Sequence, residues 1–273
     1  MKTYNYESTK AANGDTHHIF ESLSEFVRIA EDAFAEKLHG DEKGSFTAYT
    51  SFKQAVDYMK TGWSDGYSEV VKGMSGMVEH SEYVDGEALV PSYSGTEVNV
   101  DAYVAGQPEC YMDFDDVEEN RPVLRVGVQF SAQAKYSAQC FTNRGSAMLS
   151  LVEVLERGGI PVELWGYAYT EYCGKTQRID ILLKASSEPI DTDKIAFVLA
   201  HAAFYRHIGF AVKYYFGEKG ESHGTPDNCK SISMPDDAFD VVTPYSPGFL
   251  RDKVEIKKWI KTTCRNLGLE LDF

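Results

Sequence analysis

The chain of 273 residues carries a formal net charge of −15 at pH 7, and 43% of its residues are hydrophobic. This composition supplies the core of one large domain, or of a core domain with an appendage, and it excludes a chain that is disordered throughout. No apolar stretch of about eighteen residues occurs, so we expect no membrane span.

Charge is spread unevenly along the chain. Residues 1–120 hold 8 Lys and Arg against 24 Asp and Glu, residues 121–219 hold 12 against 9, and residues 220–273 hold 7 against 9. The first segment therefore repels a polyanion such as nucleic acid, whereas the slightly basic second segment does not. An excess of acid also keeps a protein in solution, whatever its partner.

Five cysteines are scattered through the sequence, and none belongs to a Cys-x-x-Cys pair. An odd number of dispersed cysteines is typical of free thiols in a reducing compartment, and it argues against a disulfide framework or a zinc site. The first residues show no hydrophobic signal region. We therefore expect a soluble, cytoplasmic protein.

The first part of the chain has the pattern of an acidic, mostly helical region. Apolar residues recur at helical spacing in three segments, residues 23–34, 52–59 and 70–78. Residues 97–104 alternate between polar and apolar side chains, which predicts a strand. An acidic stretch at residues 113–120 precedes the first strongly apolar run. We therefore expect a boundary there and two regions, 1–120 and 121–273.

The centre of the chain has the pattern of strand, loop, helix and hairpin. The apolar run at residues 123–130 predicts a strand, and a polar loop follows at residues 131–137. Residues 142–157 predict an amphipathic helix. Its inward face would consist of Met148, Leu151, Val152 and Leu155. Gly158 and Gly159 suit the left-handed exit of such a helix.

A hairpin follows this helix. A strand from residue 161 to about 172 turns back through residues 173–176 and returns to residue 184. The order strand, helix, strand is the unit of an α/β sheet with a crossover helix. In such sheets ligands bind at the carboxyl ends of the strands.

The last third of the chain predicts two helices and two strands. Asp191 or Thr192 would open a helix that continues to Tyr205, and residues 209–216 would form a strand. Residues 239–243 predict a short strand. The tail from Pro247 to Asn266 predicts a helix with Leu250, Val254, Trp259 and Ile260 on or near one face.

The histidines do not form a recognisable metal or catalytic pattern. His201 and His207 are six residues apart on a predicted helix, so they turn about 600° and face different directions. We expect His201 to be partly buried and His207 to lie near the end of the helix. His17 and His18 are expected to be exposed near the start of the chain.

Residues 124–184 resemble a von Willebrand factor A-like domain. In that family a first strand ends in Asp-x-Ser-x-Ser, an amphipathic helix follows, and two strands form a hairpin at the sheet edge. Here Arg144-Gly145-Ser146-Ala147 would open the helix, and residues 155–163 are similar to the family's join between helix and strand. The resemblance implies an α/β fold of the von Willebrand A or Rossmann type, preceded by the acidic helical region.

The loop departs from the family at the residues that hold a divalent cation. The motif reads Gln129-Phe130-Ser131-Ala132-Gln133, so a neutral amide replaces the carboxylate. Hard cations are held mainly by carboxylate oxygens. We therefore expect no metal and no cofactor. A metal-dependent hydrolase remains as a third hypothesis, since carboxylates are abundant at Asp113, Asp115, Asp116 and Asp180, but their spacing does not assemble a site.

The first functional hypothesis is a non-enzymatic interaction module that binds a protein partner. The loop at the end of the first core strand is the candidate binding surface, with the acidic helices as a further contributor. Its candidate residues are Gln129, Ser131, Gln133, Lys135 and Ser137. Self-association into a homo-oligomer is compatible with this hypothesis.

The alternative is a single-stranded nucleic-acid-binding accessory or regulatory factor, for example one encoded by a phage. Cationic side chains mixed with aromatic rings can form a platform on which unpaired bases stack. The candidate residues are Arg144, Lys175, Arg178, Arg206, Lys213, Tyr214 and Tyr215. The competing interpretation is that many of these residues belong to the core.

Overall fold

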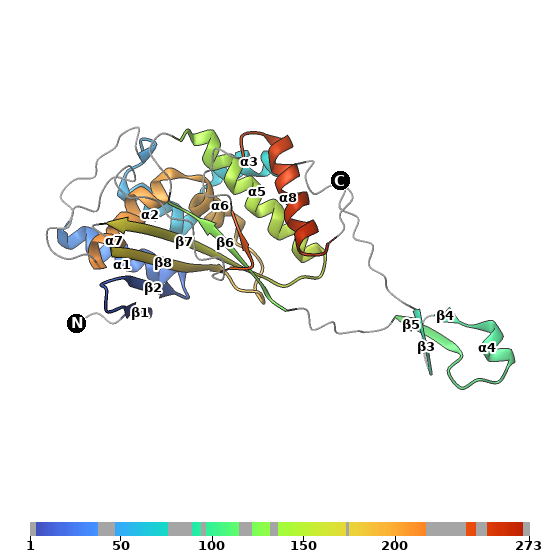
Figure 1. Ribbon diagram of the computed structural model, residues 1–273. Coiled ribbons are helices and arrows are strands. Elements are labelled where there is room, and N and C mark those ends of the chain that lie inside the picture. Colours follow the sequence, from blue (N-terminus) through green and yellow to red (C-terminus); the bar gives the residue numbers. More distant parts are fainter. Residues whose placement is uncertain are drawn as a thin grey trace. The chain divides into compact units, whose positions relative to one another are not determined.

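The computed structural model describes residues 4–37, 47–75, 89–93, 97–114, 122–131, 136–172, 175–216, 239–243 and 250–269. These residues belong to two compact units. The core unit consists of residues 1–81 and 123–273, and the inserted unit consists of residues 82–122. Figure 1 shows the elements of both units.

The core unit combines a six-stranded sheet with helices. The strands lie in the order β1-β2-β8-β7-β6-β9. They are β1 (Glu7–Lys10), β2 (Thr16–Phe20), β6 (Leu124–Gln129), β7 (Val162–Tyr172), β8 (Lys175–Lys184) and β9 (Val241–Val242). The helices are α1 (Leu23–Lys37), α2 (Phe52–Thr61), α3 (Ser64–Met74), α5 (Ala138–Arg157), α6 (Thr192–Ala200), the π-helix η2 (Phe204–Gly209), α7 (Phe210–Phe216) and α8 (Lys253–Asn266).

The sheet is mixed. Strand β6 pairs in parallel with β7 and β9, and β2 pairs in parallel with β8, whereas β1–β2 and β7–β8 are antiparallel pairs. The unit β6–α5–β7 confirms the predicted α/β class. The predicted hairpin is present as β7 and β8, but it does not lie at the sheet edge, because β2 pairs with the outer side of β8.

One face of the sheet carries the hydrophobic core. Phe20 of β2 and Phe130, directly after β6, are fully buried. The Phe26 ring of α1 meets the Phe20 ring edge to face, with 5.1 Å between centroids, and the Phe204 ring of η2 meets Phe130 at 5.5 Å. Aromatic contacts of this geometry add to the free energy gained by burying the rings. They fix α1 and η2 against the strands.

Helix α5 forms the crossover between β6 and β7. It begins at Ala138, earlier than the predicted start at Thr142, and Ser137 occupies its N-cap with an extended backbone. The four predicted inward residues are all buried, which confirms the predicted face. Gly159 has a φ of 67°, as the predicted left-handed exit requires.

Residues 209–216 form the end of η2 and helix α7, so the predicted strand is wrong. The helix that begins at Thr192 ends at Ala200, before the predicted end at Tyr205. The aromatic end of α7 favours a strand by composition, but packing along α1 decides its structure. Among the described residues no single helix is long and apolar enough to cross a membrane, and Thr192–Ala200 with Phe204–Phe216 would reach that length only across a 75° bend.

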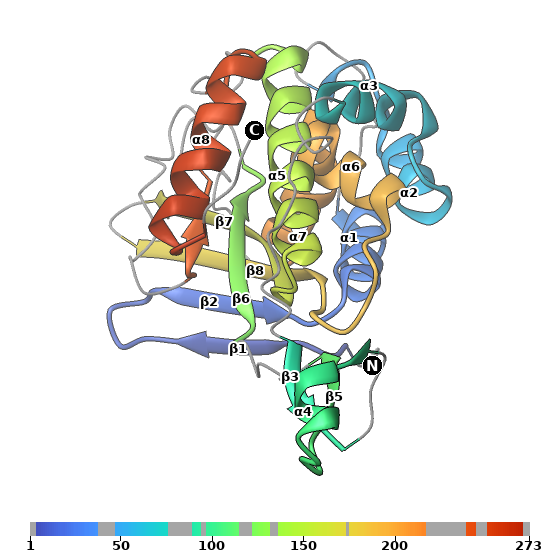
Figure 2. The ribbon, with the colours of Figure 1, turned by 90° about the vertical axis from the view of Figure 1, so that its right-hand side faces the viewer.

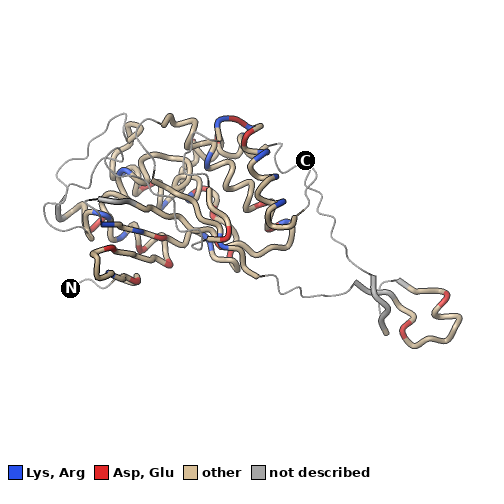
Figure 3. The backbone as a smooth tube through the Cα atoms, viewed as in Figure 1, with Lys and Arg blue, Asp and Glu red and all other residues tan. Residues whose placement is uncertain are grey.

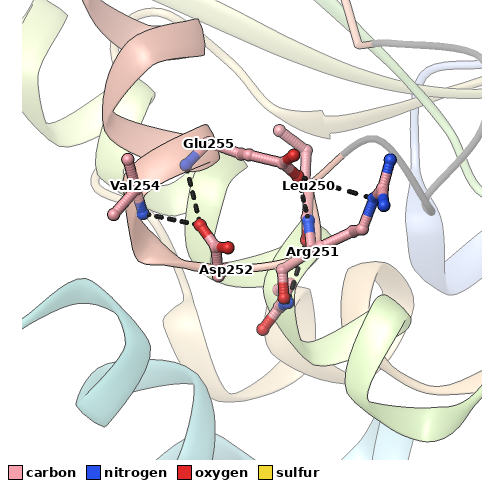
Figure 4. A network of polar contacts seen from close by, with 6 residues as sticks. Leu250, Arg251, Asp252, Val254 and Glu255 are labelled. Carbon is pink, nitrogen blue, oxygen red and sulfur yellow. Dashed lines mark hydrogen bonds and ion pairs between the residues drawn. The ribbon is translucent and has the colours of Figure 1, made fainter.

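Helix α8 is fixed at its N-terminus by a polar network (Figure 4). The Asp252 carboxylate accepts hydrogen bonds from the amides of Val254 at 2.9 Å and Glu255 at 3.0 Å. The side-chain amide of Asn143, on α5, donates to the Leu250 carbonyl at 2.8 Å. This network ties the start of α8 to α5, and the two helices lie side by side in Figures 1 and 2.

The inward face of α8 differs in part from the prediction. Leu250 and Ile260 are buried as predicted, but Val254 is 75% exposed. The helix starts at Lys253, because Asp252 supplies the cap, and the predicted residues 247–249 lie outside the described residues. The predicted strand at residues 239–243 is present as β9.

The inserted unit contains a three-stranded sheet and a short helix. Its elements are β3 (Leu89–Ser92), β4 (Glu97–Val98), α4 (Val100–Val104) and β5 (Tyr111–Phe114), with the strand order β3-β5-β4. The predicted strand at 97–104 is correct only for its first two residues. The reason is the Asn99 side chain, which accepts a hydrogen bond from the Ala102 amide at 3.2 Å and caps α4.

This division of the chain differs from the predicted regions 1–120 and 121–273. Helix α1 packs against α7, and α3 packs against α5 and α6. The helices of the first region therefore cover elements of the second and belong to the same compact unit. The acidic region is divided between the core unit and the inserted unit.

Candidate functional site

The predicted binding loop begins inside the core unit. Gln129, the last residue of β6, and Ser131 are both buried. The Gln129 side-chain amide donates to the Ser131 hydroxyl at 3.0 Å, and its Oε1 atom has no hydrogen-bond partner among the described residues. Ser137 is exposed at the start of α5, whereas Gln133 and Lys135 lie outside the described residues. Gln129 and Ser131 are therefore not surface residues.

Arg144, a candidate nucleic-acid contact, is a buried structural residue. Its side chain donates to the Leu199 carbonyl at 3.0 and 2.7 Å and to the Gln129 carbonyl at 2.6 Å. These bonds connect the end of β6 with the last turn of α6. Burial lowers the pKa of Arg144 to about 10, so the side chain keeps its charge at neutral pH. The structure thus corrects its predicted placement at a binding surface.

Arg206 and Lys213 are also buried, with 6% and 4% exposure. The Arg206 guanidinium lies 5.7 Å from the centroid of the Phe141 ring, and the Lys213 ammonium donates to the Tyr205 hydroxyl at 3.3 Å. Burial lowers the pKa of Arg206. Both residues were expected on an exposed cationic surface, and the helical structure of η2 and α7 turns them inward instead.

The four remaining nucleic-acid candidates lie on two different elements, α7 and β8. Tyr214 and Tyr215 are half-buried on α7, and the Tyr215 ring meets the Tyr4 ring edge to face at 5.7 Å. Lys175 is exposed at the start of β8. Arg178, also on β8, is held by Asp180. The structure therefore does not bring the seven predicted residues together on one exposed surface.

A His–Asp–Arg cluster joins β2 and β8. Asp180, which is 2% exposed, accepts hydrogen bonds from His17 Nε2 and from Arg178 Nε, both at 2.9 Å. His18 is 4% exposed, and its ring stacks on Phe216 with 3.9 Å between centroids. The expectation that both histidines are exposed is therefore wrong. The cluster depends on the register between β2 and β8, which places His17 opposite Arg178. Local sequence patterns do not predict this pairing.

Two histidines are kept neutral by their surroundings. Burial, with a smaller contribution from His17, lowers the pKa of His18 to about 4. Burial, with smaller contributions from His207 and Arg206, lowers the pKa of His201 to about 4. His201 is half-buried as predicted. Among the residues that the structure describes, no group of three His, Cys, Asp or Glu side chains is placed to hold a metal ion.

The inserted unit carries most of the net negative charge of the chain. Residues 82–122 hold eleven acidic residues and one basic residue, which gives −10 of the total of −15. Figure 3 shows acidic positions and no Lys or Arg on the described part of this unit. A field of one sign attracts cationic surfaces and repels nucleic acid.

The same unit exposes large apolar side chains on α4. Val100, Tyr103 and Val104 are 66%, 64% and 79% exposed. Their spacing of three and four residues places them next to one another on one face of the helix. We call these three residues the α4 apolar face. Contiguous exposed apolar surface of this kind marks sites of interaction in soluble proteins.

Few side chains are buried in the described part of the inserted unit. Ala102 and Cys110 are its buried residues among the side chains that the structure describes there. The Asn99 amide donates to the Cys110 carbonyl at 2.8 Å, which holds α4 against β5. A hydrogen bond to Glu109 raises the pKa of the exposed Tyr93 hydroxyl. The α4 apolar face remains exposed to solvent.

Residues 8–270 match the protein family described as Domain of unknown function (DUF7192), and the chain belongs to this family. The matched range contains the whole of the inserted unit. No curated protein and no solved structure matches the chain. The function must therefore be inferred from the chemistry of the chain itself.

Proposed function

We propose that the chain is a non-enzymatic interaction module that binds a protein partner through its inserted unit. The observation that carries the proposal is the coincidence of a net charge of −10 in residues 82–122 with the exposed α4 apolar face. Charge and apolar surface have different roles in such an interface. Charge guides the encounter, whereas burial of apolar area supplies most of the affinity.

The α4 apolar face has the composition of an interface centre. Tyrosine is enriched among the residues that dominate binding energy, and apolar neighbours exclude water around it. Removing the exposed parts of Tyr103 and Val104 from water would contribute roughly 2–4 kcal/mol. Acidic residues around such a centre favour a partner with a basic rim and an apolar depression. The association rate should then fall as the salt concentration rises.

The core unit supplies the framework in this proposal. The order β6, α5, β7 and β8 supports the von Willebrand A-like resemblance, because the family has the same succession of strand, helix and hairpin. The pairing of β2 with the outer side of β8 is a departure from that pattern. The buried Gln129 at the position of the family's carboxylate supports a role that does not depend on a cation.

The nucleic-acid alternative has less support. Three of its cations are buried, namely Arg144, Arg206 and Lys213, and a buried cation cannot approach a phosphate. The alternative would have to use Lys175 and the half-buried Arg178, Tyr214 and Tyr215, and Arg178 is already paired with Asp180. A gel-shift titration with a single-stranded oligonucleotide at low salt distinguishes the two hypotheses, and we expect no shift.

The interface can be tested by affinity enrichment with the full chain. We expect wild type to retain a stoichiometric protein from native extract and a Tyr103→Ser, Val104→Ser variant to retain at least about tenfold less, because the variant loses the anchors of the interface. The matched control is Val254→Ser, since Val254 is 75% exposed on α8 of the core unit. The control should retain the partner at the wild-type level.

The purified partner should then bind the wild-type chain more weakly at higher salt. Equal retention by the double variant and wild type would contradict the assignment of the α4 apolar face. Failure of wild type to retain any stoichiometric protein would contradict the proposed function itself.

A further inference from the structure

A cavity of about 570 Å³ opens where β2 and β8 end. These two strands are parallel neighbours, so their carboxyl ends meet at the same edge of the sheet. Helices α1 and α6 follow them in the chain and begin beside the cavity. Ligands of α/β sheets usually bind at the carboxyl ends of strands. The volume lies within the range of small-molecule sites.

Four apolar side chains form part of the cavity lining, and we call this part the floor. Val27 of α1, Met59 of α2 and Ile195 of α6 line it and are buried in the core, and Leu183 of β8 lines it as well. These side chains come from four packed elements, so the cavity is largely formed without a ligand. An apolar floor of this size accommodates a hydrocarbon or aromatic body.

The rim of the cavity carries charged groups that are mostly paired. Lys60 contacts Glu31 at 2.6 Å, and Lys194 contacts Asp191 at 2.7 Å. Lys184, which is 3% exposed, forms an ion pair with Glu156 on α5. The lysines of the rim are therefore already neutralised by acidic residues.

Two carboxylates at the rim have no such partner. Glu21 follows β2, Glu188 lies between β8 and α6, and neither forms an ion pair within the part of the chain that the structure describes. The acidic side chains consequently leave an excess of negative charge at the mouth of an apolar cavity. The N-terminus of α6 carries the positive end of the helix dipole, but it does not cancel this negative charge. The Asp191 carboxylate already accepts a hydrogen bond from the Lys194 amide there.

We propose that this cavity binds a small primary amine with an apolar body, with the ammonium group between Glu21 and Glu188 and the body on the Val27–Met59–Ile195 floor. An ammonium group gains from both carboxylates, whereas a carboxylate at the same place would be repelled. The site belongs to the core unit, and it does not depend on binding of a protein by the inserted unit.

Isothermal titration of the full chain with three matched probes tests this proposal. Tryptamine, tryptophol and indole-3-acetate share the indole ring and differ in charge at the end of a short side chain. We expect tryptamine to bind most tightly, and we expect a Glu21→Gln, Glu188→Gln variant to weaken it about five- to tenfold. The control is Glu7→Gln, Glu109→Gln, which changes the net charge equally at two exposed positions outside the cavity.

Obstruction of the cavity provides a second measurement. Ser24 is exposed at the cavity mouth, so Ser24→Trp should abolish tryptamine binding while leaving the thermal midpoint near that of wild type. Equal affinity for tryptophol and tryptamine would overturn the selection of an amine. Absence of heat with millimolar tryptamine, or unchanged binding in Ser24→Trp, would overturn the site.

Discussion

Replacing Arg144 by alanine is expected to lower the free energy of unfolding by about 3–5 kcal/mol. The side chain is 2% exposed and donates to the carbonyls of Gln129 and Leu199 at distances of 2.6 to 3.0 Å. Alanine would leave both carbonyl oxygens without these donors in the interior and would open a cavity. In the unfolded chain water satisfies the same oxygens, so the whole cost falls on the folded state.

Replacing Arg144 by lysine keeps the positive charge and removes the guanidinium geometry, so it separates their contributions to the unfolding free energy. A single ammonium cannot reproduce the planar fork that reaches two carbonyls, so Arg144→Lys should still cost about 2 kcal/mol. The matched control is Arg157→Ala on the same helix, where an exposed ion pair with Glu153 at 2.6 Å is lost. That variant should change stability by less than about 1 kcal/mol.

Urea denaturation followed by circular dichroism measures these differences in unfolding free energy. The comparison requires that the m-value, the slope of this free energy against urea concentration, is the same in all variants. A loss below about 1 kcal/mol for Arg144→Ala would show that the two carbonyls find other donors. The assignment of Arg144 as the connection between β6 and α6 would then be wrong.

The strand–helix–hairpin at the centre of the chain could be predicted because its signals are local. An apolar run defines β6, a helical period defines α5, and Gly159 with a φ of 67° ends the helix region. Each signal agrees with the packing that the residues adopt in the sheet. The secondary structure of a segment can be predicted from its sequence when the local conformational preference agrees with the tertiary packing.

Segments whose structure depends on distant partners were not predicted. Strand β2 has the sequence Thr-His-His-Ile-Phe, and its role becomes visible only through pairing with β8. Helix α7 ends in an aromatic run that favours a strand, yet packing against α1 makes it helical. In both cases tertiary contacts outweigh intrinsic preference.

The candidate sites show the same division. The concentration of acid near residues 82–122 is visible in the sequence, but the exposure of Val100, Tyr103 and Val104 requires the structure. The cations Arg144 and Lys213 look like surface residues by type, and they are buried because their donors satisfy interior oxygens. Residue type alone does not distinguish a surface cation from one that satisfies an interior acceptor.

Acidification is expected to destabilise the core unit between about pH 6.5 and pH 4 through two histidines. Burial lowers the pKa of His18 and of His201 to about 4, whereas a histidine in an unfolded chain titrates near 6.5. As the pH falls, the unfolded chain therefore binds these protons first. The stability that is fully present above about pH 6.5 decreases until the folded groups are also protonated near pH 4.

Two substitutions remove this titration while each keeps one local contact of the histidine; His18→Phe loses the hydrogen bond to Ser8, and His201→Asn loses the ring contact with Trp63. His201 Nδ1 accepts a hydrogen bond from the Ala203 amide at 3.0 Å, and an asparagine Oδ1 can accept the same bond. His18→Phe keeps a ring against Phe216. Each variant should reduce the loss of unfolding free energy between pH 7 and pH 4 by up to about 3 kcal/mol.

Urea titrations at a series of pH values measure how the unfolding free energy declines as the pH falls. The control is Lys72→Gln, a substitution at an exposed site, which should show the same decline as wild type. The pH range of the decline is the decisive feature, because carboxylates in ion pairs also lose their contribution on acidification, but mainly below the histidine window. If His201→Asn and His18→Phe declined as steeply as wild type between pH 6.5 and pH 4, the buried histidines would not be the source of the acid sensitivity. The decline would then have to arise from carboxylates.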